Sequence, residues 1–333
     1  MGETMNTRAF RHSTLVGVVL LAISLAFTSA PAGPPAGRST GQPTTRPTTQ
    51  TKGITPMLSG QELIRDIDDC RVAKGELAVW WMGQHSFIVK AADRVIYLDP
   101  FLTPMKSRQV PPLLSPDEVT NADLILGSHD HIDHIDRPVW PALAKASPKA
   151  KFVVPDLLRE KLARELKIPA ERFVGVDDGN AVDVGGVRIT GVAAAHEFLD
   201  QDPATGKFPH MGYVIEANGC TFYHSGDCCI YEGLQTKLKR WSFDLVLLPI
   251  NGRDAKRLAS GCIGNMTYQE AADLAGALKP RVTIPAHWDM FANNPGDPAA
   301  FTEYLRVKYP RLPVHVCKHG ERFTLPARAD PRK

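Results

Sequence analysis

The sequence has few cysteines, almost no net charge and no apolar run long enough to favour a membrane-spanning helix. Its 6 cysteines are too few and too scattered over 333 residues for a disulfide framework. A hydrophobic share of 43% with 23% charged residues is ordinary for a globular protein with a sizeable core. The Gly-x-Ser-x-Gly motif of serine hydrolases and the Gly-x4-Gly-Lys-Ser/Thr motif of phosphate-binding loops are both absent. Neither motif therefore supplies the chemistry of this chain.

The small positive charge lies at the front of the chain. Residues 1–56 contain 5 of the 39 basic side chains and 1 of the 36 acidic ones, so the remainder carries a net charge of −1. A nearly neutral body offers no basic surface of the kind that binds nucleic acid. We therefore expect no nucleic-acid partner.

Residues 1–30 have the pattern of a secretory signal peptide. The apolar run 14–28 follows two arginines and is shorter than the roughly 20 residues that a spanning helix needs. Small residues follow the run, so we expect cleavage near Ala30 or Ala32 and export to the periplasm or the cell exterior, with no stable membrane span afterwards. No cysteine ends the run and no Arg-Arg pair precedes it, which favours the general export route. An uncleaved N-terminal anchor is the alternative.

The segment after the signal, residues 31–56, is rich in Pro, Thr and Gly and contains almost no large apolar residue. Such a composition buries too little surface to offset its ordering entropy, so we expect a disordered linker. The remaining pattern predicts one folded domain over residues 57–326 and a short tail over 327–333. One domain is favoured over two because the candidate ligands described below extend from His129 to His287.

Apolar periodicity predicts both strands and helices. Residues 77–82, 86–90 and 94–99 are β-branched or aromatic runs separated by short turns, which indicates an antiparallel meander. Thr267, with Glu270 three residues later, forms a capping box at the start of a helix. The predicted helices cover residues 61–69, 139–146, 156–166, 267–278 and 298–307. The other predicted strands cover residues 122–126, 187–193, 212–217, 220–224, 245–250, 282–285, 314–316 and 323–325. This pattern fits two packed sheets flanked by helices.

Four potential metal ligands lie within six residues, directly after the predicted buried strand 122–126. They are His129, His131, Asp133 and His134. Neutral imidazole nitrogens and carboxylate oxygens are ligands that divalent metals prefer. On a bend after a strand, the first two can point one way and the last two another, so one short loop can hold two adjacent metals. The alternative, a solvated loop that binds nothing, is disfavoured by three histidines with an interleaved carboxylate.

Three more polar residues stand at the ends of apolar runs farther along the chain. They are His196, Asp227 and His287. Gly226 allows the chain to turn tightly before Asp227. Each residue alone is as consistent with a structural role as with metal binding. Together with the loop of residues 129–134, they supply enough ligands for a binuclear site.

The order of these residues resembles that of the metallo-β-lactamase superfamily, in which His-x-His-x-Asp-His follows a strand and a histidine, an aspartate and a last histidine come later. The resemblance implies an α/β fold, the αββα sandwich of two mixed sheets flanked by helices, with metals at one edge between the sheets. The implied ligands of one metal are His129, His131 and His196. Those of the other metal are Asp133, His134 and His287, and Asp227 bridges the two.

Further motifs resemble one branch of the superfamily, which contains ascorbate-6-phosphate lactonase and, more distantly, a phospholipase D acting on N-acyl phosphatidylethanolamine. The resemblance extends over residues 77–325, and it implies that segment 262–266 forms a loop over the metals. The lactonase carries an acidic residue where this chain has His196 and is cytoplasmic, so its substrate does not transfer directly. The matching segments are Trp80-Trp81-Met82-Gly83, Leu98-Asp99-Pro100, Tyr223-His224-Ser225-Gly226-Asp227, Asn251-Gly252-Arg253 and Ile284-Pro285-Ala286-His287-Trp288-Asp289.

The resemblance implies a metal-dependent hydrolase. Two divalent ions, zinc by the His-rich ligand set or manganese by the resemblance, would lower the pKa of a bridging water and supply hydroxide. The favoured reaction is lactonase-like hydrolysis of a small cyclic ester. The alternatives are a phosphodiesterase or phospholipase D-like hydrolase and, outside the enzymes, a metal-binding envelope protein without turnover.

The predicted catalytic residues are Asp133, Asp227 and His224, the last as a proton donor to the leaving group. Asp99 ends a predicted strand and is expected to accept an N–H from a metal-bound imidazole. His85 is equally consistent with a contact to substrate and with packing. The sequence sets no oligomeric state.

Overall fold

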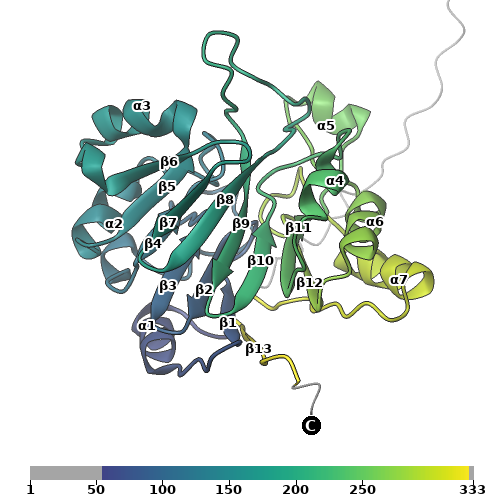
Figure 1. Ribbon diagram of the computed structural model, residues 1–333, viewed down its shortest axis with the longest axis horizontal. Helices are drawn as coiled ribbons and strands as arrows, with labels where there is room; N and C mark the ends of the chain where they lie inside the picture. Colours follow the sequence, from purple (N-terminus) through teal and green to yellow (C-terminus); the bar gives the residue numbers. More distant parts are fainter. Residues whose placement is uncertain (1–54, 330–333) are drawn as a thin grey trace, which may run out of the picture. The chain divides into compact units, whose positions relative to one another are not determined.

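The computed structural model describes residues 55–329 (Figure 1). The predicted signal peptide, most of the predicted linker and residues 330–333 lie outside the described residues. The described helices and strands begin with α1 (Gly60–Asp69) and end with β13 (Arg322–Leu325). All of them therefore fall inside the predicted domain of residues 57–326.

The first sheet has seven strands in the order β13-β1-β2-β3-β4-β5-β6. Strands β1 to β3 form the predicted antiparallel meander, and β3 to β6 run parallel to one another. Strand β13 pairs antiparallel with β1, so the last strand lies beside the first. The bounds of the other strands are β1 Leu77–Trp81, β2 Phe87–Ala91, β3 Arg94–Leu98, β4 Leu124–Leu126, β5 Lys151–Pro155 and β6 Phe173–Val176.

The second sheet has six strands in the order β12-β11-β10-β9-β8-β7. Strands β7 to β10 are antiparallel, and β10 to β12 are parallel. Asn218 and Gly219 join β9 to β10 with positive φ angles of 54° and 78°, the conformation that an Asn-Gly hairpin turn favours. The bounds are β7 Ala181–Val184, β8 Val187–Ala193, β9 Met211–Ala217, β10 Cys220–His224, β11 Leu245–Pro249 and β12 Val282–Ala286.

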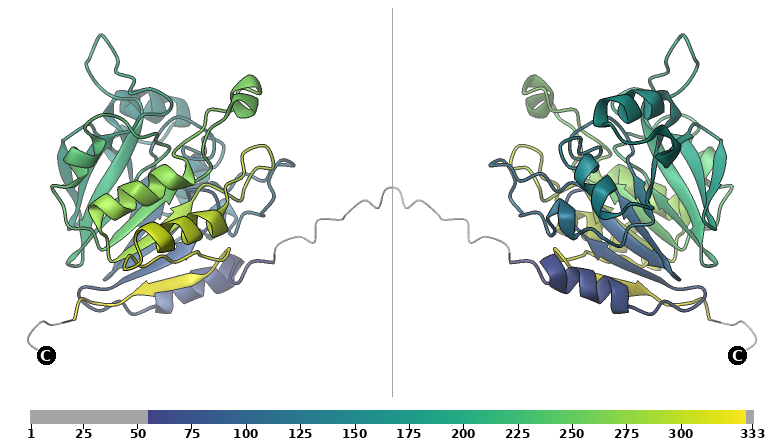
Figure 2. Two further views of the ribbon diagram at one scale, coloured as in Figure 1. Left: turned by 90° about the vertical axis from the view of Figure 1, so that its right-hand side faces the viewer. Right: turned by 90° about the vertical axis from the view of Figure 1, so that its left-hand side faces the viewer.

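The two sheets pack face to face, and helices cover their outer faces (Figure 1). Along β1, Val79 and Trp81 point into the core between the sheets, whereas Ala78 and Trp80 pack against the core under α1, α2 and α3. A third core joins the second sheet to α4, α6 and α7, and Figure 2 shows the last two side by side. The remaining helix bounds are α2 Trp140–Ala146, α3 Asp156–Leu166, α4 Leu234–Leu238, α5 Ala255–Ala259, α6 Tyr268–Leu278 and α7 Pro298–Lys308. This is the αββα sandwich that the sequence predicts.

Most predicted elements are present, and the differences have local causes. The capping box is confirmed, because Thr267 accepts from the Glu270 N–H while the Glu270 carboxylate accepts from the Thr267 N–H. The predicted strand 314–316 is wrong, since Val314 forms a single bridge with Thr283 before the chain leaves the second sheet to reach β13 in the first. The sequence pattern does not predict β5, β6 or β7.

The described part of the chain has two further properties that bear on the predictions. Between residues 55 and 329, no helix combines the length and the apolar character that a membrane crossing requires. All six cysteines lie in this part, and each is unpaired. Cys228 and Cys229, beside the candidate ligand Asp227, are buried free thiols.

Candidate metal centre

The seven predicted ligands converge at one edge of the sandwich. The loop of residues 129–134 follows β4 in the first sheet, whereas His196, Asp227 and His287 follow β8, β10 and β12 in the second. These three strands run in the same direction, so their carboxyl ends meet one edge of the sheet. Each side chain therefore owes its position to the end of a buried strand, as the sequence indicates.

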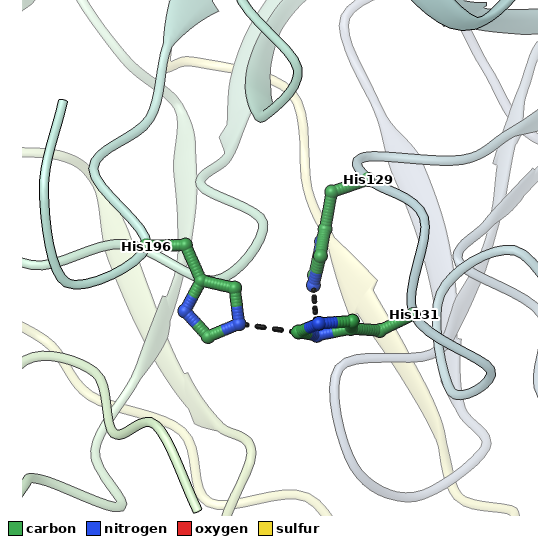
Figure 3. Close-up of side chains that lie close together, drawn as sticks. All are labelled: His129, His131 and His196. Atoms are coloured by element: carbon green, nitrogen blue, oxygen red, sulfur yellow. Dashed lines mark hydrogen bonds between the residues drawn. The ribbon is translucent and has the colours of Figure 1, made fainter. Parts of the chain in front are cut away.

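The first group of ligands consists of His129, His131 and His196 (Figure 3). Nδ1 of His131 lies 3.0 Å from Nε2 of His129 and 3.1 Å from Nε2 of His196. One ring nitrogen offers either a proton or a lone pair, so hydrogen bonding serves at most one of these contacts well. Three nitrogens at such spacings suit a shared cation, to which each is bound at about 2.0–2.1 Å.

The second group consists of Asp133, His134 and His287. Oδ2 of Asp133 lies 3.6 Å from Nε2 of His134 and 3.7 Å from Nε2 of His287. These separations are close to those of ligand atoms that share one metal ion with bonds of about 2.1 Å. The loop turns between the two groups because the N–H groups of His134 and Ile135 both donate to the His131 carbonyl. The loop thus presents its candidate ligands to both groups, and His129 also lies close enough to His134 and Asp227 for these three to share an ion.

Asp227 lies between the two groups. Its Oδ1 is 3.2 Å from Nε2 of His134, and its Oδ2 is 3.1 Å from Nε2 of His287 and 3.8 Å from Nε2 of His196. Gly226 precedes it at φ 57°, in the left-handed region that the tight turn needs. The carboxylate thus occupies the position that a bridging ligand requires.

The electrostatics of the cluster fit a bound cation. Burial lowers the pKa of His129 well below its usual value, so its ring is neutral and free to ligate. Burial opposes the charge of His134, but Asp227, Asp133 and Asp99 together raise its pKa well above the usual value. Nε2 of His134 and Oδ1 of Asp227 are buried and, although they lie 3.2 Å apart, neither forms an aligned hydrogen bond among residues 55–329. Carboxylates that draw a proton onto His134 also favour a metal ion, which displaces that proton on binding. The residues present therefore fit a divalent metal.

Asp99 fixes the orientation of His134 through Nδ1, the ring nitrogen that does not face the other candidate ligands. Its Oδ2 accepts from Nδ1 of His134 at 2.6 Å and from the Ser128 hydroxyl at 2.7 Å, and its Oδ1 accepts from the Ser128 N–H at 2.7 Å. A proton held on Nδ1 leaves Nε2 of His134 with its lone pair toward the centre. Asp99 thus makes the contact that the sequence predicts for it.

His224 and His85 are buried near Asp227 and do not line the cavity described below. Nε2 of His224 donates to the His85 carbonyl at 3.0 Å, and its Nδ1 accepts from the Gly226 N–H at 3.2 Å. The His85 ring stacks on His224 with centroids 4.3 Å apart, and its Nδ1 is 3.8 Å from Oδ1 of Asp227. Because both nitrogens of His224 bind backbone, this geometry favours a supporting role for it over the predicted proton donation.

A cavity of about 400 Å³ opens onto the ligands. Cys262 and Ile263 form part of its wall, which places the segment 262–266 where the resemblance implies. None of the described residues that line the cavity is a lysine or an arginine. The remaining wall residues besides the ligands are Gln84, Ser107, Ser260, Gly261, Phe291, Asn293 and Asn294.

The sequence pattern does not predict two residues that lie near the candidate ligands. Gln84 contacts both Asp133 and His287 through its side-chain amide. The ring of His210 lies 5.4 Å from the rings of His129 and His196. A glutamine after a glycine indicates only a turn, so Gln84 carries no ligand pattern. His210 directly precedes β9, which runs antiparallel to β8 and β10, so it lies at the same edge of the sheet as the ends of those strands. A histidine beside a strand is a weak indication of a site.

Known proteins share both the sequence pattern and the fold. The sequence model of the beta-lactamase superfamily domain matches residues 94–288, a span that contains all seven candidate ligands. The UPF0173 metal-dependent hydrolase of Thermococcus onnurineus is 30% identical over 73% of this chain and 97% of its own length. That of Nitratidesulfovibrio vulgaris is 28% identical over 74% of this chain and 95% of its own.

Among solved structures, Igni18, a metallo hydrolase from Ignicoccus hospitalis, superposes with a TM-score of 0.60 at 21% identity, covering 76% of this chain and 100% of that one. The isothiocyanate hydrolase from Delia radicum gut bacteria superposes with a TM-score of 0.57 at 16% identity, covering 76% and 100%. Both share the fold. Ligand order, sheet arrangement and the matched span agree, and the chain belongs to the metallo-β-lactamase superfamily.

Proposed function

We propose that this chain, a metal-dependent hydrolase of the metallo-β-lactamase superfamily, hydrolyses a small, uncharged cyclic ester at a binuclear metal centre. The observation that carries the choice of substrate is the cavity of about 400 Å³, whose described wall outside the candidate ligands offers amide, hydroxyl, thiol and apolar groups but no lysine or arginine. A lactone needs hydrogen-bond donors and a modest apolar contact, and these are what the wall supplies.

The seven converging residues divide into two sets of ligands. We assign one ion to His129, His131 and His196 and the other to Asp133, His134 and His287, with Asp227 shared between them. The His-rich set favours zinc, with manganese as the alternative. Bound there, the ions would lower the pKa of water toward neutrality and polarise the ester carbonyl.

The protein's own groups position the reactants and move protons. Asp133 and Asp227 line the cavity, so their carboxylates can accept the proton that the nucleophilic water loses and return it to the leaving oxygen. Asp99 holds the ring of His134 in one tautomer and keeps this part of the site preorganised. Asn293 and Asn294 stand at the wall, where their amides can hydrogen-bond the ring substituents of a lactone.

Turnover of the metal-loaded protein on matched substrates tests this proposal. A panel of uncharged γ- and δ-lactones is compared with bis-p-nitrophenyl phosphate, with Asp227→Ala as the variant that loses the shared carboxylate. We expect lactone hydrolysis at least about 100-fold above phosphodiester hydrolysis, and its loss in the variant. Phosphodiester turnover alone would favour the phospholipase D-like alternative, and two bound metals with no turnover on either class would favour a non-enzymatic metal-binding protein.

A further inference from the structure

Gln84 is a buried polar residue at the second group of ligands to which neither the family pattern nor the chemistry above gives a role. It follows β1 in the turn before β2, is 1% exposed and lines the cavity. Its Oε1 is buried without a hydrogen-bond partner among residues 55–329. Because no donor reaches this oxygen, the hydrogen bonds of the described residues do not fix which end of the amide faces the candidate ligands.

The amide stands among the atoms assigned to the second ion. Nε2 of Gln84 lies 2.9 Å from Oδ2 of Asp133 and 3.0 Å from Nε2 of His287. The ligand atoms themselves lie at comparable distances from one another, 3.7 Å between Asp133 and His287 and 3.1 Å between His287 and Asp227. The end of the Gln84 side chain is therefore spaced as a further ligand atom would be.

An amide N–H at this place conflicts with a bound ion. With the nitrogen toward the centre, its two hydrogens face Asp133 and His287 and so point into the space where a cation lies. The oxygen and nitrogen of a side-chain amide are assigned from the surrounding network, and a half-turn about the last bond exchanges them. After that half-turn, Oε1 occupies the inner position, and a carbonyl oxygen is a ligand for divalent ions.

The backbone holds the amide in place. The Gln84 N–H donates to Oδ1 of Asp289 at 2.7 Å, and its carbonyl accepts from the His287 N–H at 2.7 Å. Gln84 and His287 both have positive φ angles, 54° and 58°, which non-glycine residues seldom adopt. The two residues are thus locked together by backbone and side chain alike, and such strain is typical of functional sites.

From these contacts we infer that the side-chain oxygen of Gln84 is an additional ligand of the second metal ion, beside Asp133, His134, His287 and the shared Asp227. The ion would then have five protein ligands, two of them carboxylates, and the amide oxygen would be the one most readily displaced. The inference rests on the metal centre of the proposed function and is independent of the substrate. A change at Gln84 should therefore alter the metal affinity of the second site and not that of the first.

Zinc binding to the intact protein tests the inference without any enzyme assay. The metal-free protein is titrated with Zn²⁺ against a chromophoric chelator, which gives the number of sites and both dissociation constants. The variants are Gln84→Glu, which keeps a ligand oxygen and adds charge, and Gln84→Leu, which keeps the volume and removes every ligand atom. Gln235→Glu, at an exposed position of α4 outside the cavity lining, makes the same substitution away from the candidate ligands.

If Gln84 is a ligand, Gln84→Glu binds the second ion about tenfold more tightly and Gln84→Leu about 10- to 100-fold more weakly, while Gln235→Glu changes its affinity less than threefold. Circular dichroism confirms folding of each variant. If the amide instead donates to Asp133, the carboxylate of Gln84→Glu repels Asp133 and weakens the second site, which overturns the inference. Unchanged constants in both Gln84 variants also overturn it. A wild-type protein that binds no zinc contradicts the metal centre itself, which is a separate failure.

Discussion

At the scale of single residues, the convergence of the candidate ligands was predictable because each of them follows a recognisable pattern in the sequence. His196, Asp227 and His287 each follow an apolar run, and the buried strand β4 leads into the loop of residues 129–134. Gln84 was not predictable, because a neutral amide in a turn follows no spacing rule and its partners are 49 and 203 residues away. The same holds for the backbone contacts of His224, which depend on how the tertiary structure packs rather than on any local pattern.

Asp99 is the residue whose loss best tests the support behind the ligands. In Asp99→Asn the amide carries no negative charge and presents only one acceptor oxygen to three donors, the two from Ser128 and the one from His134. We expect the zinc affinity of the second site to fall about 10- to 100-fold. Competitive chelator titration measures this change, with the exposed Asp93→Asn as the matched control. Equal affinities in the two variants would show that the contact to His134 does not matter for metal binding.

At the scale of secondary-structure elements, local chemistry decided how much could be predicted. The Thr267 capping box and the Asn218-Gly219 turn each satisfy backbone groups within a few residues, so the sequence alone indicates them. Strand β7 is short and partly exposed, which leaves little apolar alternation to detect. Segment 314–316 has the residues of a strand but meets β12 at one bridge only, because β13 belongs to the other sheet.

The turn at Gly226 joins β10 to Asp227 and can be tested with two glycines of similar conformation. A Cβ at Gly226 would lie 2.7 Å from Cβ of Ser128 and 2.8 Å from the Met211 carbonyl oxygen, whereas one at Gly179 would meet nothing within 4 Å. Both have positive φ angles, 57° and 74°. We expect Gly179→Ala to cost about 1 kcal/mol of unfolding free energy and Gly226→Ala about 3 kcal/mol. Urea denaturation measures both, and equal losses would mean that the turn adjusts freely.

At the scale of the whole described domain, buried polar contacts join the two sheets at Asp244 as well as at the candidate metal centre. Asp244 is 2% exposed and accepts from the Thr221 N–H at 2.9 Å, from Arg281 at 3.2 Å and from Arg328 at 2.8 Å. Thr221 lies in β10 of the second sheet, whereas Arg328 follows β13 of the first.

Export of the protein remains a prediction. N-terminal sequencing of the secreted protein tests it, and we expect the mature chain to start near Ala32.

The contacts of Asp244 predict a pH-dependent stability. Burial opposes its ionisation, but the hydrogen bonds from Arg328, the Thr221 backbone and Arg281 lower its pKa below the usual 3.8. A lowered pKa adds stability above the unfolded-state value, and that stability is lost as the pH falls through the folded-state value. Asp244→Asn should therefore cost about 2–3 kcal/mol at pH 7 and less below about pH 4. Urea unfolding at both pH values, with Asp93→Asn as control, measures the difference, and an equal cost at both would contradict the assignment.

We propose that seven side chains from four strand ends hold two metal ions. Inductively coupled plasma mass spectrometry of the purified, zinc-saturated protein, after removal of unbound metal, tests it most directly. We expect about two zinc ions per chain in the wild type, about one in His196→Ala and in His287→Ala, and fewer than one in Asp227→Ala. A wild type with no zinc, or with a content that Asp227→Ala leaves unchanged, would contradict it.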